Sequence, residues 1–187
     1  TTSAAGDVNG DGYDDIIVGA SGYNLGQGRV YIYFGGINMN SVPDVIISGE
    51  ASGNYFGNSL SCAGDVNGDG YSDVIVGANS YSSSAGRAYI FFGGSVMNNV
   101  ADVIFTGAVA GDNLGFSVSK TGDVNGDGFD DVIVSATGIN SNTGKAFIYF
   151  GGVSMNNVAD VTLNGEAVNN NFGGSVSDAG DVNADGF

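Results

Sequence analysis

The chain of 187 residues contains no histidine and no tryptophan, one cysteine, one proline and four basic residues. Without histidine it lacks the commonest general base, and without tryptophan it lacks the commonest ring for stacking on sugars. The lone Cys62 excludes a disulfide framework within the chain and a thiolate metal site. Twenty acidic residues give a net charge of −16, so nucleic acid is not an expected partner.

No apolar run approaches the roughly 20 residues that a membrane-spanning helix needs, so membrane insertion is not expected. No leader peptide is visible at the N-terminus. Because the sequence starts part-way through a repeat, that observation says little about location. Hydrophobic residues make up 42% of the chain, which is enough for a packed core and argues against disorder.

An acidic loop that recurs every 58 residues organises the sequence. It reads Asp-Val-Asn-Gly-Asp-Gly from Asp7, Asp65 and Asp123, and Asp-Val-Asn-Ala-Asp-Gly from Asp181, where the copy runs into the C-terminal Phe187. More than half of the acidic residues lie in these loops, where cations can neutralise them. A fixed period of this length is typical of units that stack on copies of themselves.

Each period contains four short strand-like segments and no helical periodicity. Runs of β-branched and apolar residues bounded by turn residues predict the strands, and a Gly-Gly pair after the third strand predicts a turn. The second strand is expected to be buried on both faces, because nearly all of its residues are apolar, and a polar loop follows it. The predicted strands are 1–6, 59–64, 117–122 and 175–180; 16–20, 74–78 and 132–136; 29–34, 87–92 and 145–150; and 44–49, 102–107 and 160–165.

A four-stranded unit of this size cannot bury both of its faces alone. The predicted fold class is therefore all-β, with four-stranded antiparallel blades of the β-propeller type, and a more open stack of the same sheets is the alternative. The predicted units are repeat 1 at 1–53, which lacks the start of its first strand, repeat 2 at 54–111, repeat 3 at 112–169, and the start of repeat 4 at 170–187.

Two further residue types recur with the same period. A methionine between the third and fourth strands is expected to fill the core, and a basic residue that opens the third strand is expected at a solvated edge or beside a carboxylate. The methionines are Met39, Met97 and Met155, and the basic residues are Arg29, Arg87 and Lys145.

The acidic loop carries the oxygen donors of a calcium site. Numbered from Asp7, side-chain oxygens fall at positions 1, 3, 5 and 9, and position 7 offers a backbone carbonyl. Gly12 permits a sharp turn, and about six to eight hard oxygen donors suit Ca²⁺ better than Mg²⁺. Zn²⁺ is not expected without histidine or a repeated cysteine. An Asx-turn with solvated aspartates is the alternative, but three carboxylates in so short a loop repel each other unless a cation is bound.

An EF-hand opens in the same way but needs Glu at position 12 and flanking helices. Position 12 is instead valine in a predicted strand. The sequence therefore predicts three complete calcium sites and one partial site, since the fourth copy ends before position 9. The predicted ligands are Asp7, Asn9, Asp11, Tyr13 and Asp15; Asp65, Asn67, Asp69, Tyr71 and Asp73; Asp123, Asn125, Asp127, Phe129 and Asp131; and Asp181, Asn183 and Asp185.

The repeats resemble those of the FG-GAP family, which occur in the integrin α-subunit propeller and in many bacterial surface proteins. The resemblance covers the whole chain and is carried by an aromatic-glycine pair such as Phe56-Gly57, the acidic loop, and a closing segment such as 74–78. The proline of the closing motif is absent throughout, and Leu114 replaces the third aromatic. The resemblance implies a β-propeller with Ca²⁺ in loops on one face and an extracellular or cell-surface location. The near-identity of the repeats resembles a bacterial or archaeal surface protein more than an integrin.

Three repeats fall short of the roughly four to eight blades of a closed propeller. The chain is therefore expected to be a piece of a longer array, a subunit that joins other copies of itself into a ring, or a unit that adds head to tail into a filament. Flanking repeats or other copies are the expected partners of the exposed blade edges. A surface protein or a glycan is a further candidate partner.

The function expected from these features is that of a non-enzymatic, calcium-binding extracellular module for adhesion or structural assembly. The alternative is a glycan-binding propeller appended to a polysaccharide-active enzyme, although core packing explains strand aromatics such as Tyr31 and Tyr33. An enzyme is not expected, because the chain has no histidine, no nucleophile motif and no acid cluster outside the repeats.

Overall fold

The computed structural model describes residues 1–180 and contains three four-stranded sheets. Every sheet is an antiparallel meander, in which consecutive strands are hydrogen-bonded neighbours. The first sheet holds β1 (Thr2–Gly6), β2 (Asp15–Ala20), β3 (Arg29–Tyr33) and β4 (Val45–Ser48). The second holds β5 (Ser59–Gly64), β6 (Asp73–Ala78), β7 (Arg87–Phe91) and β8 (Val103–Thr106). The third holds β9 (Leu114–Gly122), β10 (Asp131–Ala136), β11 (Lys145–Tyr149) and β12 (Val161–Asn164).

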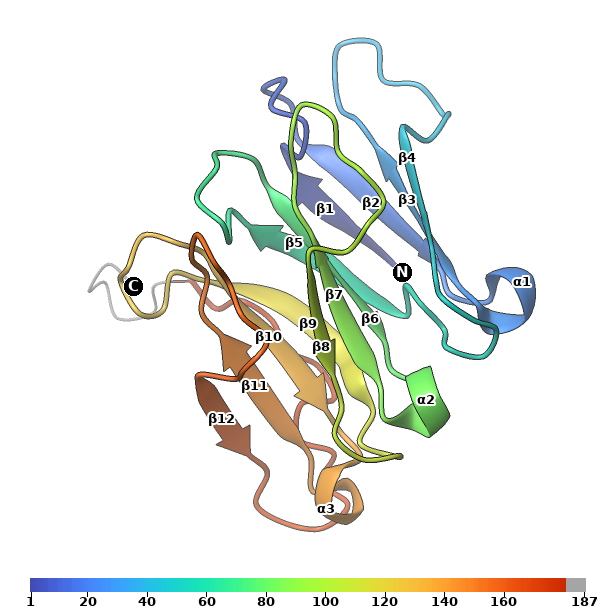
Figure 1. Ribbon diagram of the computed structural model, residues 1–187, viewed down its shortest axis with the longest axis vertical. Coiled ribbons are helices and arrows are strands. Elements are labelled where there is room, and N and C mark those ends of the chain that lie inside the picture. The colour runs from blue at the N-terminus through green and yellow to red at the C-terminus, as the bar shows by residue number, and fades with distance from the viewer. Residues whose placement is uncertain (181–187) are drawn as a thin grey trace.

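The predicted all-β class with four-stranded antiparallel blades is confirmed. The three sheets are fanned beside one another like blades and form no closed ring within residues 1–180, which agrees with an open array (Figure 1). Each of the predicted ranges 1–53, 54–111 and 112–169 contains one sheet, although their exact boundaries stay a prediction. Residues 170–180, which were expected to start a fourth unit, contain no strand.

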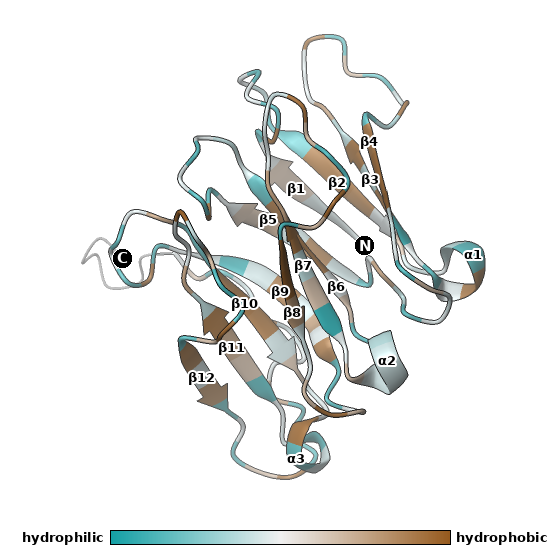
Figure 2. Cartoon of the chain, viewed as in Figure 1, coloured by the Kyte–Doolittle hydropathy of each residue, from teal (hydrophilic) through white to brown (hydrophobic). Residues whose placement is uncertain are grey.

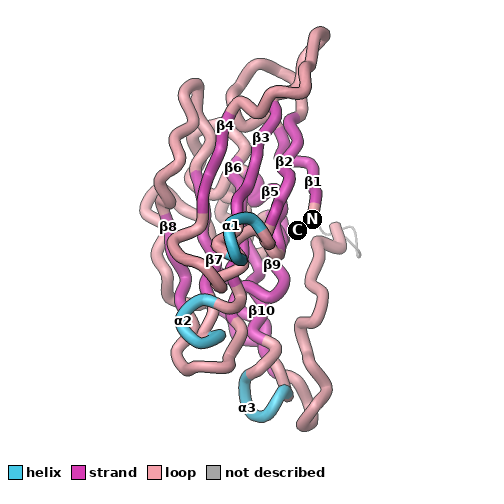
Figure 3. Tube along the Cα trace, turned by 90° about the vertical axis from the view of Figure 1, so that its right-hand side faces the viewer, coloured by secondary structure: helices cyan, strands magenta, loops and turns pink. Residues whose placement is uncertain are grey.

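The polar connection between the second and third strands is a tight turn. One-turn elements α1 (Tyr23–Gly26), α2 (Tyr81–Ser84) and α3 (Ile139–Asn142) occupy these connections (Figure 3). In α1 the φ angles of Asn24, Leu25 and Gly26 are 47°, 59° and 78°, so the chain turns in the left-handed sense. Asparagine and glycine tolerate that region best, and the N–H of Gly28 closes the turn on the carbonyl of Tyr23 at 3.1 Å.

Adjacent sheets pack face to face around an apolar core, and the strands that carry it are the most hydrophobic parts of the chain (Figure 2). At the first junction Val30, Ile32 and Ile47 of the first sheet meet Val74 and Val76 of β6, and none is more than 2% exposed. The second junction repeats this core 58 residues later with Ala88, Ile90, Phe105, Val132 and Val134. Burial of one such side chain contributes about 1.5–3 kcal/mol, so the stacking of sheets stabilises the fold.

The face of the first sheet that points away from the second sheet, here called the leading face, is not covered by another sheet. The prediction that the second strand is buried on both faces holds for β6 and β10 but is wrong for β2. Ile16 is 41% exposed, whereas its equivalents Val74 and Val132 are fully buried against a preceding sheet. For the same reason Met39 is 46% exposed, while Met97 lies in the first junction core as expected.

At the other end of the stack, the face of the third sheet that points away from the second sheet, here called the trailing face, is also uncovered. Val103 and Phe105 of β8 are 7% and 1% exposed because the third sheet covers them. Their equivalents Val161 and Leu163 of β12 are 37% and 39% exposed. The described chain therefore ends in two apolar sheet faces whose counterparts are buried inside the stack.

Glycine is required where neighbouring sheets approach most closely. A Cβ added to Gly77 would lie 2.2 Å from the carbonyl oxygen of Gly115, and one added to Gly19 would lie 2.4 Å from that of Gly57. Since these neighbours are backbone atoms, they cannot move aside cheaply. The third repeat has Ser135 at this position, and the segment that follows it at 170–180 forms no strand.

We expect the substitution Gly77→Ala to lower the free energy of unfolding by about 1–3 kcal/mol, the usual cost of overpacking. Urea denaturation measures this change as a lower midpoint with an unchanged slope. Gly22→Ala is the matched control, because a Cβ there meets nothing within 4 Å and the backbone has a negative φ of −79°. Equal losses in the two variants would contradict a specific clash at the sheet junction.

Candidate metal-binding loops

The three acidic loops connect the first and second strands of each sheet and lie at the opposite end of the strands from α1, α2 and α3 (Figure 1). They span residues 7–14, 65–72 and 123–130. Their hydrogen bonds are the same in all three copies, so the repeat in the sequence is also a repeat in geometry.

Each loop is wound around the carboxylate of its first aspartate. Asp7 Oδ1 accepts the N–H groups of Gly10 and Asp11 at 2.7 and 3.1 Å, and Oδ2 accepts that of Gly12 at 2.8 Å. Gly10 and Gly12 have φ angles of 77° and 89°, which turn their N–H groups inward at no Cβ cost. Asp65 and Asp123 make the same bonds.

The loop also brings the side chains at positions 3 and 5 together. Asn9 Nδ2 donates to Asp11 Oδ2 at 3.0 Å, and the backbone N–H of Asp11 donates to Asn9 Oδ1 at 2.9 Å. Asp11 Oδ1 in turn accepts the N–H of Tyr13 at 3.0 Å. Positions 1, 3 and 5 therefore gather their oxygens along one short turn on the surface of the protein.

The aspartate at position 9 lies behind the loop. Asp15 is 1% exposed, and Asp73 and Asp131 are fully buried. Asp15 Oδ2 accepts the N–H of Val8 at 2.8 Å, and Oδ1 accepts that of Gly35, which follows β3, at 2.7 Å. This carboxylate fastens the base of the loop to the sheet, a role that the sequence analysis did not assign to it.

Within the described part of the chain, no basic side chain lies beside the buried carboxylates. Burial raises the pKa of Asp15 and Asp131 and raises that of Asp73 to about 7, and the charges at positions 1 and 5 add to the effect, although the two N–H bonds oppose it. In contrast, backbone N–H groups, chiefly that of Gly128, lower the pKa of Asp123. The one ion pair among residues 1–180 joins Arg87 and Glu50 at a sheet junction.

Neighbouring loops are coupled through side chains that the sequence analysis did not assign to that purpose. Position 7 was predicted to offer its backbone carbonyl, which stays a prediction. Its aromatic side chain also has a structural role: the ring of Tyr71 packs on the first acidic loop, since a Cβ on Gly10 would lie 2.5 Å from Tyr71 Cε1. Asp130 Oδ2 accepts the N–H of Asp65 from the preceding sheet at 2.8 Å. The aromatic found at position 7 of every copy was the available signal.

The donor set fits a hard cation in its chemistry, since positions 1, 3 and 5 supply carboxylate and amide oxygens and no sulfur or imidazole. Within residues 1–180, however, no three acidic, histidine or cysteine side chains lie close enough to hold an ion as they stand. Binding through positions 1, 3, 5, 7 and 9 therefore stays a prediction. The partial fourth site at Asp181, Asn183 and Asp185 lies outside the described residues.

The FG-GAP repeat family model matches residues 1–33, 56–91 and 114–149, which make up more than half of the chain and contain the first three strands of each sheet. The chain belongs to the FG-GAP repeat family. A 52-residue part of it, 27% of the chain, is also 52% identical to integrin alpha-6 of Gallus gallus. That stretch spans 5% of the integrin, so the likeness concerns the repeat and not the whole integrin chain.

The two motifs that name the FG-GAP repeat meet at the sheet junctions. Phe56 is 2% exposed in the first junction core, and the N–H of Gly57 donates to the carbonyl of Gly77 at 2.9 Å. Leu114, which replaces the aromatic in the third repeat, is 3% exposed and fills the equivalent place in the second junction core. This departure from the family pattern thus preserves the packing.

Proposed function

We propose that this chain is a calcium-binding, non-enzymatic module of an extracellular or cell-surface protein that serves adhesion or structural assembly. The observation that carries the proposal is the acidic loop, which occurs three times with the same hydrogen bonds. Each copy combines clustered surface oxygens with a buried carboxylate that no basic side chain of the described residues neutralises. A divalent cation is the simplest source of the missing positive charge.

Calcium is the cation favoured by the donor chemistry. Carboxylate, amide and carbonyl oxygens on a glycine-rich turn suit its flexible coordination, whereas Mg²⁺ demands near-ideal octahedral geometry and keeps several waters. When bound, the ion would be held by the side chains at positions 1, 3, 5 and 9 of each loop, with the carbonyl of position 7. The carboxylate at position 9 also accepts backbone N–H groups at the base of the loop. Calcium in this place stiffens a turn and performs no reaction.

The family membership supports the non-enzymatic and extracellular parts of the proposal. FG-GAP repeats are generally non-enzymatic and typical of extracellular proteins, and the likeness to integrin alpha-6 points the same way. No helix in residues 1–180 is long and apolar enough to cross a membrane. The absence of histidine from the whole chain further disfavours acid–base catalysis.

A glycan-binding role is the second candidate, because a groove of about 230 Å³ lies between the first two sheets and is lined by Phe56, Tyr89 and Phe91. These rings are at most 4% exposed and pack against one another, with Phe56 edge-on to Tyr89 at a centroid distance of 5.4 Å. Rings buried in this way are not available to stack on a sugar. We therefore favour the structural role, and specific binding in a glycan array would reverse that preference.

Isothermal titration calorimetry with Ca²⁺ tests the proposal directly. We expect three sites in the chain, with weaker binding of Mg²⁺. Asp69→Asn should remove one site and leave two, because asparagine retains the oxygen that accepts the N–H of Tyr71 but loses the charge. Asp102→Asn, in a carboxylate outside the loops that accepts the N–H of Phe92, is the matched control and should keep all three. Absence of Ca²⁺ binding to the wild-type chain would refute the proposal.

A further inference from the structure

The second acidic loop is tied to the third by a carboxylate at position 8 of the third loop. Asp130 Oδ2 accepts the backbone N–H of Asp65 at 2.8 Å, and the N–H of Asp130 donates to the carbonyl of Asp65 at 3.2 Å. Gly64, whose φ angle is 78°, leaves room for this approach, because a Cβ there would overlap the carboxylate of Asp130. Asp130 therefore holds both polar backbone groups of the first aspartate of the second loop.

The contact between the first and second loops has the backbone bond but not the carboxylate. Position 8 of the second loop is Ser72, and its N–H donates to the carbonyl of Asp7 at 2.9 Å. The short side chain of Ser72 packs on Gly6, where an added Cβ would lie 2.7 Å from Ser72 Cβ. Serine at this position offers no carboxylate to the N–H of Asp7.

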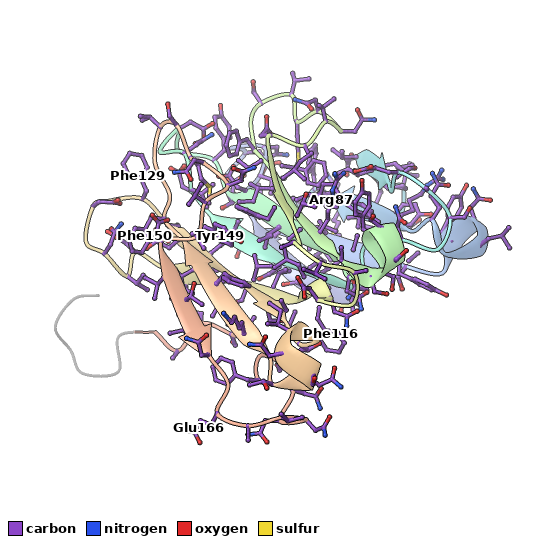
Figure 4. All side chains as sticks on the ribbon, turned by 60° about the horizontal axis from the view of Figure 1, so that its bottom comes forward. Arg87, Phe116, Phe129, Tyr149, Phe150 and Glu166 are labelled. Carbon is purple, nitrogen blue, oxygen red and sulfur yellow. The ribbon has the colours of Figure 1, made fainter. Side chains whose placement is uncertain are left out.

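Two further contacts between neighbouring loops occur in both pairs. The aromatic ring at position 7 packs on the position 4 glycine of the preceding loop, and Figure 4 shows one such ring, that of Phe129, at the loop end of the sheets. In addition, the second glycine of each Gly-Gly pair donates its N–H to the position 2 carbonyl of the preceding loop. These bonds run from Gly94 to Val8 at 2.8 Å and from Gly152 to Val66 at 2.7 Å. The side chain at position 8 is therefore the feature that distinguishes the two pairs.

Asp130 stands between two residues that the third loop would use to hold an ion. Phe129 offers the carbonyl of position 7, and Asp131 offers the carboxylate of position 9. Asp131 is fully buried and accepts two backbone N–H groups at 2.9 and 2.8 Å, which fixes the chain directly after Asp130. An occupied third loop thus restricts Asp130. Asp130 in turn restricts Asp65, around whose carboxylate the second loop is wound.

We propose that Asp130 is a positioning residue of the second calcium site, and that occupation of the third loop raises the affinity of the second. This inference rests on the proposed binding of Ca²⁺ by the loops. A restricted Asp130 fixes Asp65 in advance, so the second loop loses less conformational freedom when it binds. Linkage makes the effect mutual, and an occupied second loop strengthens the third by the same factor. The first loop, which faces Ser72, depends less on its neighbour.

Nuclear magnetic resonance can follow each loop separately in the full chain. The N–H groups of Gly12, Gly70 and Gly128 each donate to the first aspartate of their own loop at 2.8 Å, so their signals report the state of that loop. Titration with chelator-buffered Ca²⁺ at physiological ionic strength gives the half-saturating Ca²⁺ concentration of every loop. The dispersion of the other amide signals shows whether each variant is folded.

Removal of the third site is expected to weaken the second. Asp127→Asn should raise the half-saturating Ca²⁺ concentration measured at Gly70 by about fivefold or more, the lower end of the usual coupling between sites. Asp69→Asn is the matched control, because it removes the same charge from the loop that follows the first one. It should change the value measured at Gly12 by less than about twofold. Equal changes at Gly70 and Gly12 would overturn the role of Asp130.

Exchange of the side chain at position 8 separates positioning from charge. Double-mutant cycles with Asp127→Asn measure how far Gly70 still depends on the third loop. Asp130→Ser copies Ser72 and should remove this dependence, whereas Asp130→Asn keeps an acceptor oxygen and should retain most of it. Ser72→Asp should make Gly12 depend on the second loop. Equal effects of Asp130→Ser and Asp130→Asn would assign the coupling to charge and overturn the positioning role.

The same titration distinguishes this inference from the proposed function. If none of the three glycine signals responds to Ca²⁺, the loops do not bind the ion and both proposals fail. If all three respond independently of one another, calcium binding stands and only the coupling through Asp130 is overturned.

Discussion

Removal of calcium with EDTA is expected to lower the melting temperature by about 5–10 °C for each site that was occupied at one hundred times its dissociation constant. Binding to the native state at that concentration stabilises it by about 2.7 kcal/mol per site. A domain of this size shifts by about 2–4 °C per kcal/mol. The effect is large because the acidic side chains of all three loops form no ion pair with a basic side chain in the part of the chain that the structure describes. Circular dichroism during heating in Ca²⁺ and in EDTA measures it.

A triple variant separates loop binding from a general effect of the cation on an acidic protein. Replacement of Asp11, Asp69 and Asp127 by Asn keeps the acceptor oxygens of the three turns but removes one charge from each. This variant should melt at the same temperature in Ca²⁺ and in EDTA. Asp102→Asn is the control outside the loops and should retain the wild-type difference. Identical melts of the wild-type chain in the two buffers would rule out calcium as a stabilising ligand.

The strands could be predicted closely from the sequence because each repeat alternates apolar strands with turn residues. The third strand was expected at 29–34 but ends at Tyr33, because the N–H of Phe34 donates to the carboxylate of Asp44 instead of a strand partner. The left-handed turn at Asn24 could not be predicted from the sequence, since several loop conformations suit a short polar stretch. Contacts with the segment that connects the first two sheets select one of these conformations. The N–H of Tyr55, which donates to Gly26 O at 2.7 Å, is one such contact.

The role of position 9 was missed although the signal was present. Alternate residues of a strand share a face, and Asp15 opens β2 two residues before the fully buried Ile17. This alternation places the carboxylate on the core side of the sheet, where it accepts the backbone N–H groups of Val8 and Gly35. The open faces of the first and third sheets, in contrast, depend on what is packed beside them.

Loss of the buried carboxylate should destabilise the protein strongly. Asp73→Ala leaves the N–H groups of Val66 and Gly93 without the acceptors that they now reach at 2.9 and 2.8 Å. An unsatisfied buried donor costs about 1–3 kcal/mol, so we expect a loss of about 2–6 kcal/mol in chemical denaturation. Asp102→Ala removes an exposed acceptor of one N–H at the same distance and should cost about 1 kcal/mol. Equal losses of unfolding free energy in Asp73→Ala and Asp102→Ala would show that burial of the carboxylate does not determine the cost of its removal.

The conservative variant Asp73→Asn yields a prediction about pH. Burial raises the pKa of Asp73 to about 7, whereas an aspartate in the unfolded chain titrates near 3.9. Between these values the native state holds a proton that the unfolded state has lost, so the stabilisation present at low pH fades as pH rises, by up to about 4 kcal/mol across the window. Asparagine does not titrate, so in EDTA the wild-type chain should lose stability relative to Asp73→Asn between about pH 4 and 7.

Calcium should flatten this difference, because a cation bound to the loop favours the ionised carboxylate behind it and lowers the pKa. The experiment compares unfolding free energies of the wild-type chain and Asp73→Asn across that pH range, with Ca²⁺ and with EDTA. Parallel profiles in EDTA would contradict the raised pKa. A difference that persists unchanged in Ca²⁺ would show that the ion does not act on the buried carboxylate, and that the loop and its base are electrostatically independent.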